Sequence, residues 1–381
     1  MTRPFEGVKI LDFTQVLAGP YASYQLALLG AEIVKVERRD GEDMRRTPLS
    51  REWAERGLAP GWQAINGNKK SLTLDLTKPE AIAIVKQLAA ASDVVMENFR
   101  PGVMDKLGIG YAALSEVNPR LVYCAITGYG QNGPKAQVAG HDLNYQADAG
   151  LLSIAAGSDG APVVPNALIA DIAGGAYPAV INILLALRQR DATGRGCRLD
   201  VAMTDGLLPF AYWGIGNGIA TGRWPRPGGE LLSGGSPRYQ IYATADGKYL
   251  AAAPLEDRFW ANFCEAIGLA TALRDDRKDA QATRRAAAEI IRTRTADEWT
   301  QQFAGKDVCC NVVRTLAEAM SDPQFKQRGV FRRSVVGAED ALPAISVPID
   351  DAFRAVATEL RYPGLGEGNG ILHGKDAKSE E

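Results

Sequence analysis

The stretch VKILDFTQVLAGPYASYQLALLGAEIVKVE (residues 8–37) decides the fold class. Its first part, VKILDF (8–13), predicts a buried strand, and EIVKVE (32–37) alternates apolar and polar residues as a half-buried strand does. Between them, AGPYASYQLALLG predicts a helix with Pro20 near its start and Gly30 at its end. A strand, a helix and a second strand at this spacing indicate a parallel βαβ unit.

The same alternation continues along the chain. KSLTLDL (70–76), DVVMENF (93–99) and LVYCAIT (121–127) each predict a strand. EAIAIVKQLAAA after Pro79 predicts a helix between the first two strands, and a short helix begins at Pro101. Strands and helices in this order favour an α/β fold with a doubly wound, Rossmann-like parallel sheet.

The second half of the chain changes in character. AGGAYPAVINILLALRQRDATGRG predicts an apolar helix, and residues 199–222 predict a second long helix. The segment RWPRPGGELLSGGSP (223–237) is rich in Pro and Gly and indicates a boundary. VPIDD, near residues 347–351, suggests a return of the chain to the main sheet.

These observations predict two domains. The large α/β domain comprises residues 1–222 plus 331–381, and the small α+β domain comprises residues 223–330. The small domain begins with a hairpin, RYQIYATADGKYLAAA, and continues with amphipathic helices.

Composition narrows the function classes. The net charge is −2, and the 43 basic and 45 acidic residues are interspersed, so no basic stripe for nucleic acid is present. The five cysteines form no CxxC pair, which favours reduced thiols and a cytoplasmic location. No signal peptide or run of 18 apolar residues is apparent, so no membrane association is expected. With two histidines in the chain, no metal site is expected either.

Three polar residues stand out in apolar or glycine-rich surroundings. His141 lies in GHDLNYQADAG and is one of only two histidines, and imidazole is suited to proton exchange near neutral pH. Asp171, in NALIADIAGGA, is either a helix cap or a carboxylate able to act as base or nucleophile. Glu256, in AAAPLEDRFW, has the same two interpretations.

Other residues point to a ligand crevice. TQVLAGPYAS (14–23) joins the end of the first strand to a helix, where parallel sheets bind ligands, although it lacks the GxGxxG pattern of dinucleotide-binding proteins. Basic residues occur near several strand ends and, as a set, favour a phosphate-rich ligand; they are Lys35, Arg38, Arg39, Lys69, Lys70, Arg100 and Lys106.

Seven blocks of sequence, in order, resemble the class III CoA-transferase superfamily, which includes the carnitine CoA-transferase and formyl-CoA transferase family. They are GVKILDFTQVLAGPYAS, LGAEIVKVERRDGED, KSLTLDL, VVMENFRPGVMDKLGIG, ITGYGQNGP, TGRGCRLDVAMTDG and YATADGKYL. GHDLNY with His141, followed by DIAGG with Asp171, is similar to the α-methylacyl-CoA racemase branch, as are GGSP (234–237) and Glu256. Gln15 and the VKVERRDGED block look more like the transferase branch.

The resemblance implies a function and a set of site residues. His141 and Asp171 would be the acid–base pair of an acyl-CoA racemase or epimerase, with Asp142 and Glu256 assisting. In the alternative, a CoA-transferase, Asp171 would be the nucleophile that forms an aspartyl-CoA intermediate. A CoA-binding protein without catalysis is a third interpretation. The residues implied to contact CoA are Val16, Ala18, Arg38, Lys70, Leu72, Asn98, Arg100 and Lys106.

The resemblance also implies partners. Coenzyme A would enter as part of the acyl-CoA substrate, with no permanently bound cofactor. Two copies of the chain would form an interlocked homodimer.

Overall fold

The structure is a computed structural model that describes residues 3–47, 51–55, 59–157, 160–337, 341–354 and 359–373. Two compact units make up the chain. The first comprises Met1–Ala149, Ala167–Pro209 and Pro323–Glu381, and the second comprises Gly150–Asn166 and Phe210–Asp322.

These units differ from the predicted domains at their boundaries. The second unit begins at Phe210, before the expected boundary at residue 223, and it also takes in Gly150–Asn166. A physical reason is visible in the loop after residue 150. The N–H of Gly228 donates to the carbonyl of Ile154 at 2.9 Å, which ties this loop to the Pro- and Gly-rich segment.

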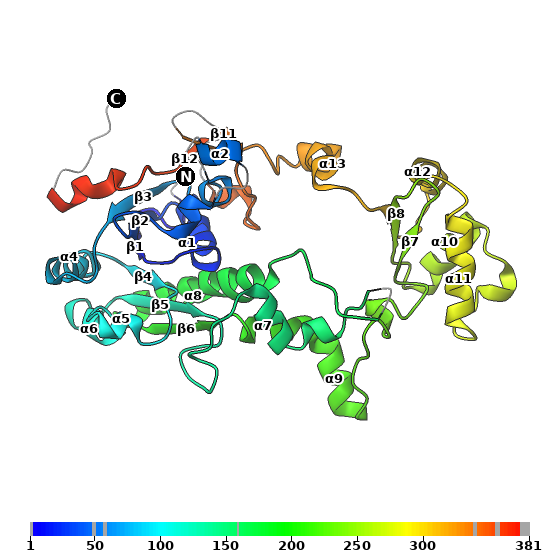
Figure 1. Cartoon of the computed structure of the whole chain (residues 1–381), viewed down its shortest axis with the longest axis horizontal. Coiled ribbons are helices and arrows are strands. Elements are labelled where there is room, and N and C mark those ends of the chain that lie inside the picture. Colours follow the sequence, from blue (N-terminus) through cyan, green and yellow to red (C-terminus); the bar gives the residue numbers. More distant parts are fainter. Residues whose placement is uncertain are drawn as a thin grey trace. The chain divides into compact units, whose positions relative to one another are not determined.

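The main sheet of the first unit has six strands in the order β3-β2-β1-β4-β5-β6, and every neighbouring pair is parallel. Figure 1 shows the sheet with β1 and β4 at its centre. The doubly wound α/β fold predicted from the sequence is therefore confirmed. The strands are β1 (Lys9–Asp12), β2 (Glu32–Glu37), β3 (Lys69–Thr73), β4 (Val94–Glu97), β5 (Val122–Thr127) and β6 (Arg198–Ala202).

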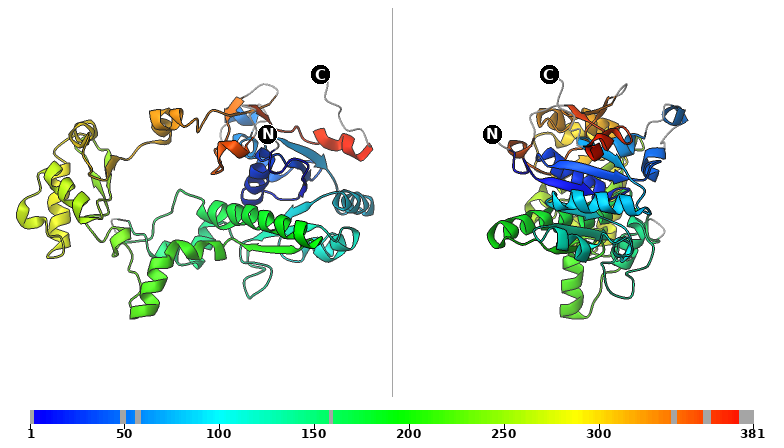
Figure 2. Two further views of the ribbon diagram at one scale, coloured as in Figure 1. Left: turned by 180° about the vertical axis from the view of Figure 1, so that it is seen from behind. Right: turned by 90° about the vertical axis from the view of Figure 1, so that its left-hand side faces the viewer.

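Helices cover both faces of this sheet (Figures 1 and 2). On one face, α1 (Ala18–Leu28) packs against α8 (Tyr177–Thr193). On the other lie α4 (Pro79–Ala90), α5 (Val103–Lys106) and α6 (Tyr111–Val117). The buried apolar cluster between the sheet and α4–α6 includes Leu11, Phe13, Leu72, Val85, Val95, Met104, Leu114 and Tyr123.

One helical stretch, Ala170–Thr193, is long and apolar enough to span a membrane by composition alone. Half of its most apolar window is buried inside the structure. Its second part, α8, packs on β5, β6 and α1. Contacts within the first unit therefore cover part of its apolar surface, while Ile181, Leu184 and Leu185 are exposed.

Two sequence predictions were wrong. Residues 199–222 do not form one long helix, because Leu199–Ala202 pair with Cys124–Thr127 and complete the sheet as β6. Only Tyr212–Thr221 (α9) is α-helical in that stretch. Residues 347–351 do not join the main sheet. The strands near them, β10 (Ser334–Val336), β11 (Ala341–Pro343) and β12 (Glu359–Arg361), form a separate small sheet.

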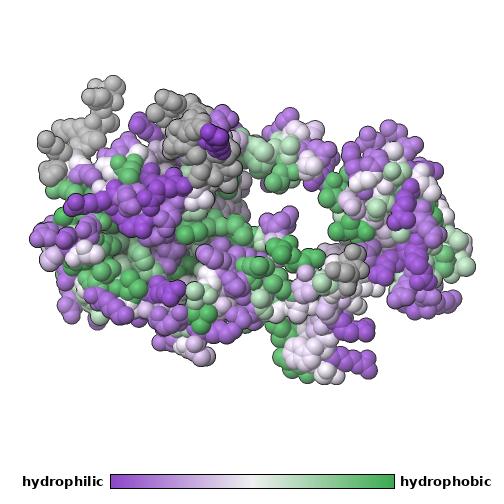
Figure 3. All heavy atoms as spheres, in the orientation of Figure 1, coloured by the Kyte–Doolittle hydropathy of each residue, from purple (hydrophilic) through white to green (hydrophobic). Residues whose placement is uncertain are grey.

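The second unit contains an antiparallel sheet of β7 (Gln240–Ala243), β8 (Tyr249–Ala252) and β9 (Cys310–Val312). The predicted amphipathic helices are α10 (Asp257–Ile267), α11 (Ala280–Ile291) and α12 (Ala296–Phe303). Their apolar faces meet in a core with Trp260, Phe263, Ile291 and Trp299, while their outer surface is largely hydrophilic (Figure 3).

Shorter elements complete both units. The remaining α-helices are α2 (Arg51–Glu55), α3 (Pro60–Gln63), α7 (Asp142–Asp148), α13 (Leu316–Ser321) and α14 (Pro323–Gln327). Short 3-10 helical segments are η1 (Asp43–Arg46), η2 (Leu151–Ser153), η4 (Asp205–Ala211), η5 (Leu231–Ser233), η6 (Thr271–Leu273), η7 (Asp351–Phe353) and η8 (Glu367–His373). A widened, π-type helical segment, η3 (Ala170–Ala176), leads directly into α8.

The two glycines of DIAGG allow η3 to approach the turn after β6. A Cβ on Gly174 would lie 2.4 Å from the carbonyl oxygen of Met203, which is backbone and cannot swing away. A Cβ on Gly175 would lie 2.9 Å from Cγ of the Met203 side chain. Close helix–turn packing, rather than a special backbone angle, therefore requires glycine here.

We predict that Gly174→Ala lowers the free energy of unfolding by about 1–3 kcal/mol, the usual cost of overpacking. Urea denaturation measures it. The matched control is Gly61→Ala in α3, where the nearest atom is 3.9 Å from the added Cβ, so no loss is expected. Equal losses in both variants would contradict the packing argument.

Candidate active site

A cavity of about 440 Å³ lies at the carboxyl ends of the central strands. Its walls come from the segments that follow β1, β4, β5 and β6, together with residues around His141 and Asp171. The strand order reverses between β1 and β4, so the chain leaves these two strands toward opposite faces of the sheet. Ligands of doubly wound folds bind at this switch point.

Asn98 bridges the two diverging loops. Its Oδ1 accepts the backbone N–H of Gln15 at 2.9 Å, and its Nδ2 donates to the carbonyl of Gln15 at 2.8 Å. Both polar backbone groups of Gln15 are therefore held by one side chain from the neighbouring strand end. The loop after β1 enters α1, whose amino-terminal end has no side-chain cap and reaches the cavity at Ala18.

Buried charges support this loop from beneath. Asp12 is fully buried and accepts hydrogen bonds from Thr14 and Ser23. Burial acts to raise the pKa of Asp12, but Lys69 and Lys35 together with the hydroxyl groups outweigh it, so the pKa is lowered and the group stays ionised. Burial lowers the pKa of Lys69 to about 8, against the opposing charge of Asp12. These groups are structural and lie behind the cavity wall.

His141 and Asp171 both line the cavity, although they come from different segments. His141 immediately precedes α7, and its backbone N–H donates to Oδ1 of Asn144 at 3.0 Å. Its side chain is exposed, whereas Asp171 is half-buried at the start of η3. The structure brings the two residues to one cavity, as the resemblance implied.

Asp142 links these two segments. Its Oδ2 accepts the backbone N–H groups of Ala170 at 2.7 Å and Asp171 at 3.0 Å, and its Oδ1 accepts from Gln146. Asp142 is buried, and both of its oxygens are engaged. Asp142 directly follows His141 in the sequence, so these hydrogen bonds fix the backbone of Asp171 relative to His141.

The surroundings of Asp171 change its acidity. Burial is the largest cause, the negative charge of Asp142 adds to it, and His141 opposes both; together they raise the pKa of Asp171 to about 6. A carboxyl group with this pKa can both release and accept a proton near neutral pH. Perturbed carboxyl groups in clefts are typical of catalytic sites.

Four of the eight predicted CoA contacts line this cavity, namely Val16, Ala18, Asn98 and Arg100. The other four lie outside its lining. Leu72 is fully buried in the core, and Lys106 is exposed at the end of α5. Arg38 is half-exposed and pairs with Asp43 at 2.8 Å.

Lys70 also lies outside the lining of this cavity. It is the second residue of β3, at the amino end of the strand, and it pairs with Glu32 at 2.8 Å. It lines a separate cavity with Arg3 and Arg361. Glu256 belongs to the second unit, where it directly precedes α10, and the cavity described above is lined by residues of the first unit.

Some lining residues were not predicted from the sequence. They include Gln15, Phe99, Thr127, Gly128, Tyr129, Asn144, Tyr145 and Met203. Thr127 and Gly128 follow the same rule as Asn98, since each lies at the carboxyl end of a central strand. Within the part of the chain that the structure describes, the buried hydroxyl of Thr127 has no hydrogen-bond partner.

The doubly wound sheet, with a titratable pair beside a cavity at its switch point, defines a class of α/β enzymes that act on bound small molecules. The model of CoA-transferase family III matches residues 5–369, and the chain belongs to this family. The family predicted from the sequence is therefore confirmed.

Relatives of two kinds are similar to this chain. α-Methylacyl-CoA racemase of Mus musculus is 32% identical over 365 residues, which cover 95% of this chain and 90% of that protein. Succinate–glutarate CoA-transferase of Agrobacterium fabrum is 34% identical over 380 residues, covering 96% and 93%. The crystal structure of a CAIB/BAIF family protein from Brucella suis has a TM-score of 0.83 and 29% identity, covering 98% of this chain and 99% of that one.

The raised pKa of Asp171 predicts a pH-dependent stability effect. A carboxyl group whose pKa rises on folding, here from 3.8 to about 6, stabilises the folded protein below pH 4, and this contribution is lost as the pH rises through 6. Asp171→Asn keeps the shape of the side chain without the charge. Its melting temperature relative to wild type should therefore rise between pH 4 and pH 7.

Thermal unfolding of both proteins across this pH range tests the effect. The control is Glu116→Gln, which replaces an exposed carboxylate on α6, away from the cavity, and its difference from wild type should stay flat. A decrease for Asp171→Asn with rising pH would show that ionised Asp171 is stabilised in the fold, contrary to the expected sign.

Proposed function

We propose that the protein is an acyl-CoA racemase or epimerase that inverts a 2-methylacyl-CoA at Cα, with His141 and Asp171 as the acid–base pair. One observation carries the proposal: the two residues line one cavity from separate segments, and the pKa of Asp171 is about 6. Inversion at carbon needs one group to remove a proton from one face and another group to return a proton to the opposite face. A single base cannot reach both faces.

The chemistry follows from the groups in the cavity. His141 removes the Cα proton of one enantiomer, the thioester becomes an enolate, and Asp171 in its protonated form delivers a proton to the other face. For the opposite enantiomer the roles exchange. The negative charge of the enolate oxygen needs hydrogen-bond donors or a positive dipole nearby. The uncapped amino-terminal end of α1 at Ala18 reaches the same cavity and suits this role.

CoA itself would be held by the loops at the switch point. Arg100 brings a guanidinium to the wall of the cavity, and guanidinium groups bind phosphate by paired, charge-assisted hydrogen bonds. The side chain of Asn98 is already bound to the backbone of Gln15, so Asn98 shapes the wall rather than binds charge.

A CoA-transferase is the second candidate, supported by the 34% identity to succinate–glutarate CoA-transferase. In that reaction a carboxylate oxygen of Asp171 attacks the thioester carbonyl and CoA leaves as a thiolate. The thiolate then attacks the Asp171 carbonyl of the mixed anhydride and expels the first carboxylic acid. The resulting aspartyl-CoA thioester passes CoA to an acceptor carboxylate by the reverse steps. His141 has no role in this sequence.

We predict incorporation of deuterium at Cα when 2-methyldecanoyl-CoA is incubated with the protein in deuterated water, without any carboxylate acceptor. His141→Ala and Asp171→Ala should each reduce racemisation by about 10²–10⁴-fold. Each variant should retain slow exchange of one enantiomer only, and the two variants should differ in which one. Mass spectrometry and chiral separation of the acyl group measure this, with Glu116→Gln as the control.

The transferase gives a different pattern. Acyl exchange would then require added succinate, His141→Ala would be nearly normal, and hydroxylamine would trap an acylated Asp171. That combination would overturn the racemase proposal and leave the family assignment in place.

Arg100 and Lys70 make a matched test of where CoA binds. Arg100→Ala should weaken the binding of free CoA by roughly 10- to 150-fold, the value of a lost charge-assisted hydrogen bond of about 1.5–3 kcal/mol. Lys70→Ala removes a cation of similar exposure at the opposite edge of the sheet and should leave the dissociation constant unchanged. Isothermal titration calorimetry measures both. Equal weakening of CoA binding by the two substitutions would contradict the placement of the phosphates at Arg100.

A further inference from the structure

Val16 adopts an unusual backbone conformation at the wall of the cavity. Its φ is +68°, and the other non-glycine residues with positive φ in the described part of the chain are Asn68 and Cys309. Of these three residues, Val16 has a β-branched side chain, and β-branched residues have the highest free-energy cost in the left-handed region. Backbone strain of this kind persists only where the surroundings impose it, and it gathers at ligand sites.

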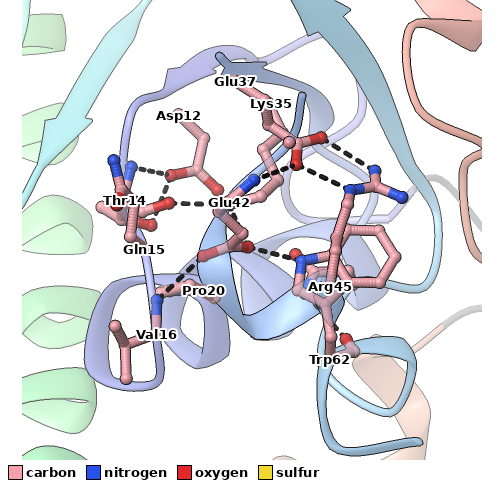
Figure 4. A network of polar contacts seen from close by, with 12 residues as sticks. Asp12, Thr14, Gln15, Val16, Pro20, Lys35, Glu37, Glu42, Arg45 and Trp62 are labelled. Carbon is pink, nitrogen blue, oxygen red and sulfur yellow. Dashed lines mark hydrogen bonds and ion pairs between the residues drawn. The ribbon is translucent and has the colours of Figure 1, made fainter. Parts of the chain in front are cut away.

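Glu42 imposes this conformation. Its Oε2 accepts the backbone N–H of Val16 at 3.0 Å (Figure 4). The carboxylate is itself held in place, because its Oε1 lies 3.0 Å from Nζ of Lys35 and accepts the indole N–H of Trp62. Glu42 and Lys35 are both buried. A fixed hydrogen-bond acceptor is therefore set directly beneath Val16.

Lys35 holds the other end of the same short segment. Its Nζ donates to the carbonyl of Thr14 at 2.7 Å. With Asn98 on Gln15 and Glu42 on Val16, three side chains from separate elements fix three consecutive backbone units. The side chain of Val16 then faces the cavity and is 46% exposed.

A neighbouring carboxylate in the same network does not touch this loop. Glu37 binds Arg45 at 2.7 Å and accepts from Ser71, and Arg45 stacks on Trp62 at 3.6 Å from the ring centroid (Figure 4). Glu37 is as buried as Glu42 and equally paired. Its Oε1 also accepts the backbone N–H of Glu42 at 3.5 Å, so Glu37 is not independent of Glu42. Asp276 in the second unit is likewise buried and pairs with Arg238 at 2.8 Å, and it serves as the control for the structural effect of losing a buried carboxylate.

A contribution to folding stability does not by itself explain why Lys35 and Glu42 form a buried ion pair. Moving two charges out of water costs about as much as their attraction returns, and apolar replacements of buried pairs are often neutral or stabilising. Fixing a strained loop is a task that apolar residues cannot perform, because the Val16 N–H requires an acceptor.

We propose that Glu42, backed by Lys35, is a positioning residue for coenzyme A: it holds Val16 in the left-handed conformation that shapes the loop for the ligand. This inference rests on the proposed function only in taking a CoA ester as the ligand. Glu42 acts through the backbone of Val16 and takes no part in proton transfer. Its loss therefore changes CoA affinity and leaves the chemical step alone.

The test is a double-mutant cycle with free CoA as the calorimetric probe. Glu42→Gln should raise the dissociation constant about 5- to 30-fold, which corresponds to the usual penalty of the left-handed region for a residue with a Cβ. In the Val16→Gly background the same substitution should raise it less than about twofold, because glycine adopts positive φ without that penalty. The turnover number for Cα exchange should stay within about twofold of its parent in both backgrounds.

Asp276→Asn is the matched control and should lower the melting temperature with less than a twofold change in CoA affinity. Should Glu42→Gln fail to fold, Glu42→Asp replaces it, since it keeps the charge beside Lys35 but is shorter by one methylene, and the same pattern is expected. Equal weakening by Asp276→Asn, or the same factor in the wild-type and Val16→Gly backgrounds, would overturn the inference alone. Absence of CoA binding by the wild-type protein would overturn it together with the proposed function.

Discussion

The reversal of strand order between β1 and β4 is the constraint on which the site depends. Right-handed crossovers carry the chain to opposite faces of the sheet on the two sides of this point, so the loops after β1 and β4 must separate. The gap exposes backbone groups that need partners. The side chain of Asn98 binds the backbone of Gln15, Lys35 binds the carbonyl of Thr14, and Glu42 binds the N–H of Val16. These contacts fix the loop that forms a wall of the cavity.

A different set of contacts shapes the side of the cavity that holds His141 and Asp171. Asp142 closes the start of η3 with two backbone hydrogen bonds, and by doing so it places its own charge near Asp171. The interaction that fixes the position of Asp171 therefore also raises its pKa. The close approach of Gly174 to Met203 then anchors the far end of η3 against the sheet. The carboxylate of Asp142 therefore affects both the position and the acidity of Asp171.

The sequence was sufficient for the elements whose patterns are local. KILD, EIVKVE and VYCAIT are apolar or alternating runs, and each became a strand of the main sheet. Leu199–Ala202 was misassigned because four residues beside a long apolar helix carry no clear period, and pairing with β5 decides their conformation. The sequence shows that Lys70 is near a strand but not that it lies at the amino end of that strand. Glu42 gave no signal, since its partner Val16 is distant along the chain and is met through the backbone.

The acidity of Asp171 fits reversible inversion better than nucleophilic attack. Two enantiomers of one thioester have equal free energy in solution, so an efficient racemase must run with similar ease in both directions. If the two bases had very different pKa values, one direction of the reaction would be slow. In that direction the weaker base would have to remove the proton, and the conjugate acid of the stronger base would have to return one. Burial and the charge of Asp142 raise the pKa of Asp171 from 3.8 to about 6, so its protonated form is available near neutral pH to return a proton. A carboxylate nucleophile must be ionised to attack, because protonation removes the electron pair, and a buried negative neighbour lowers the ionised fraction. The charge of Asp142 beside Asp171 therefore favours the proposed role in proton transfer.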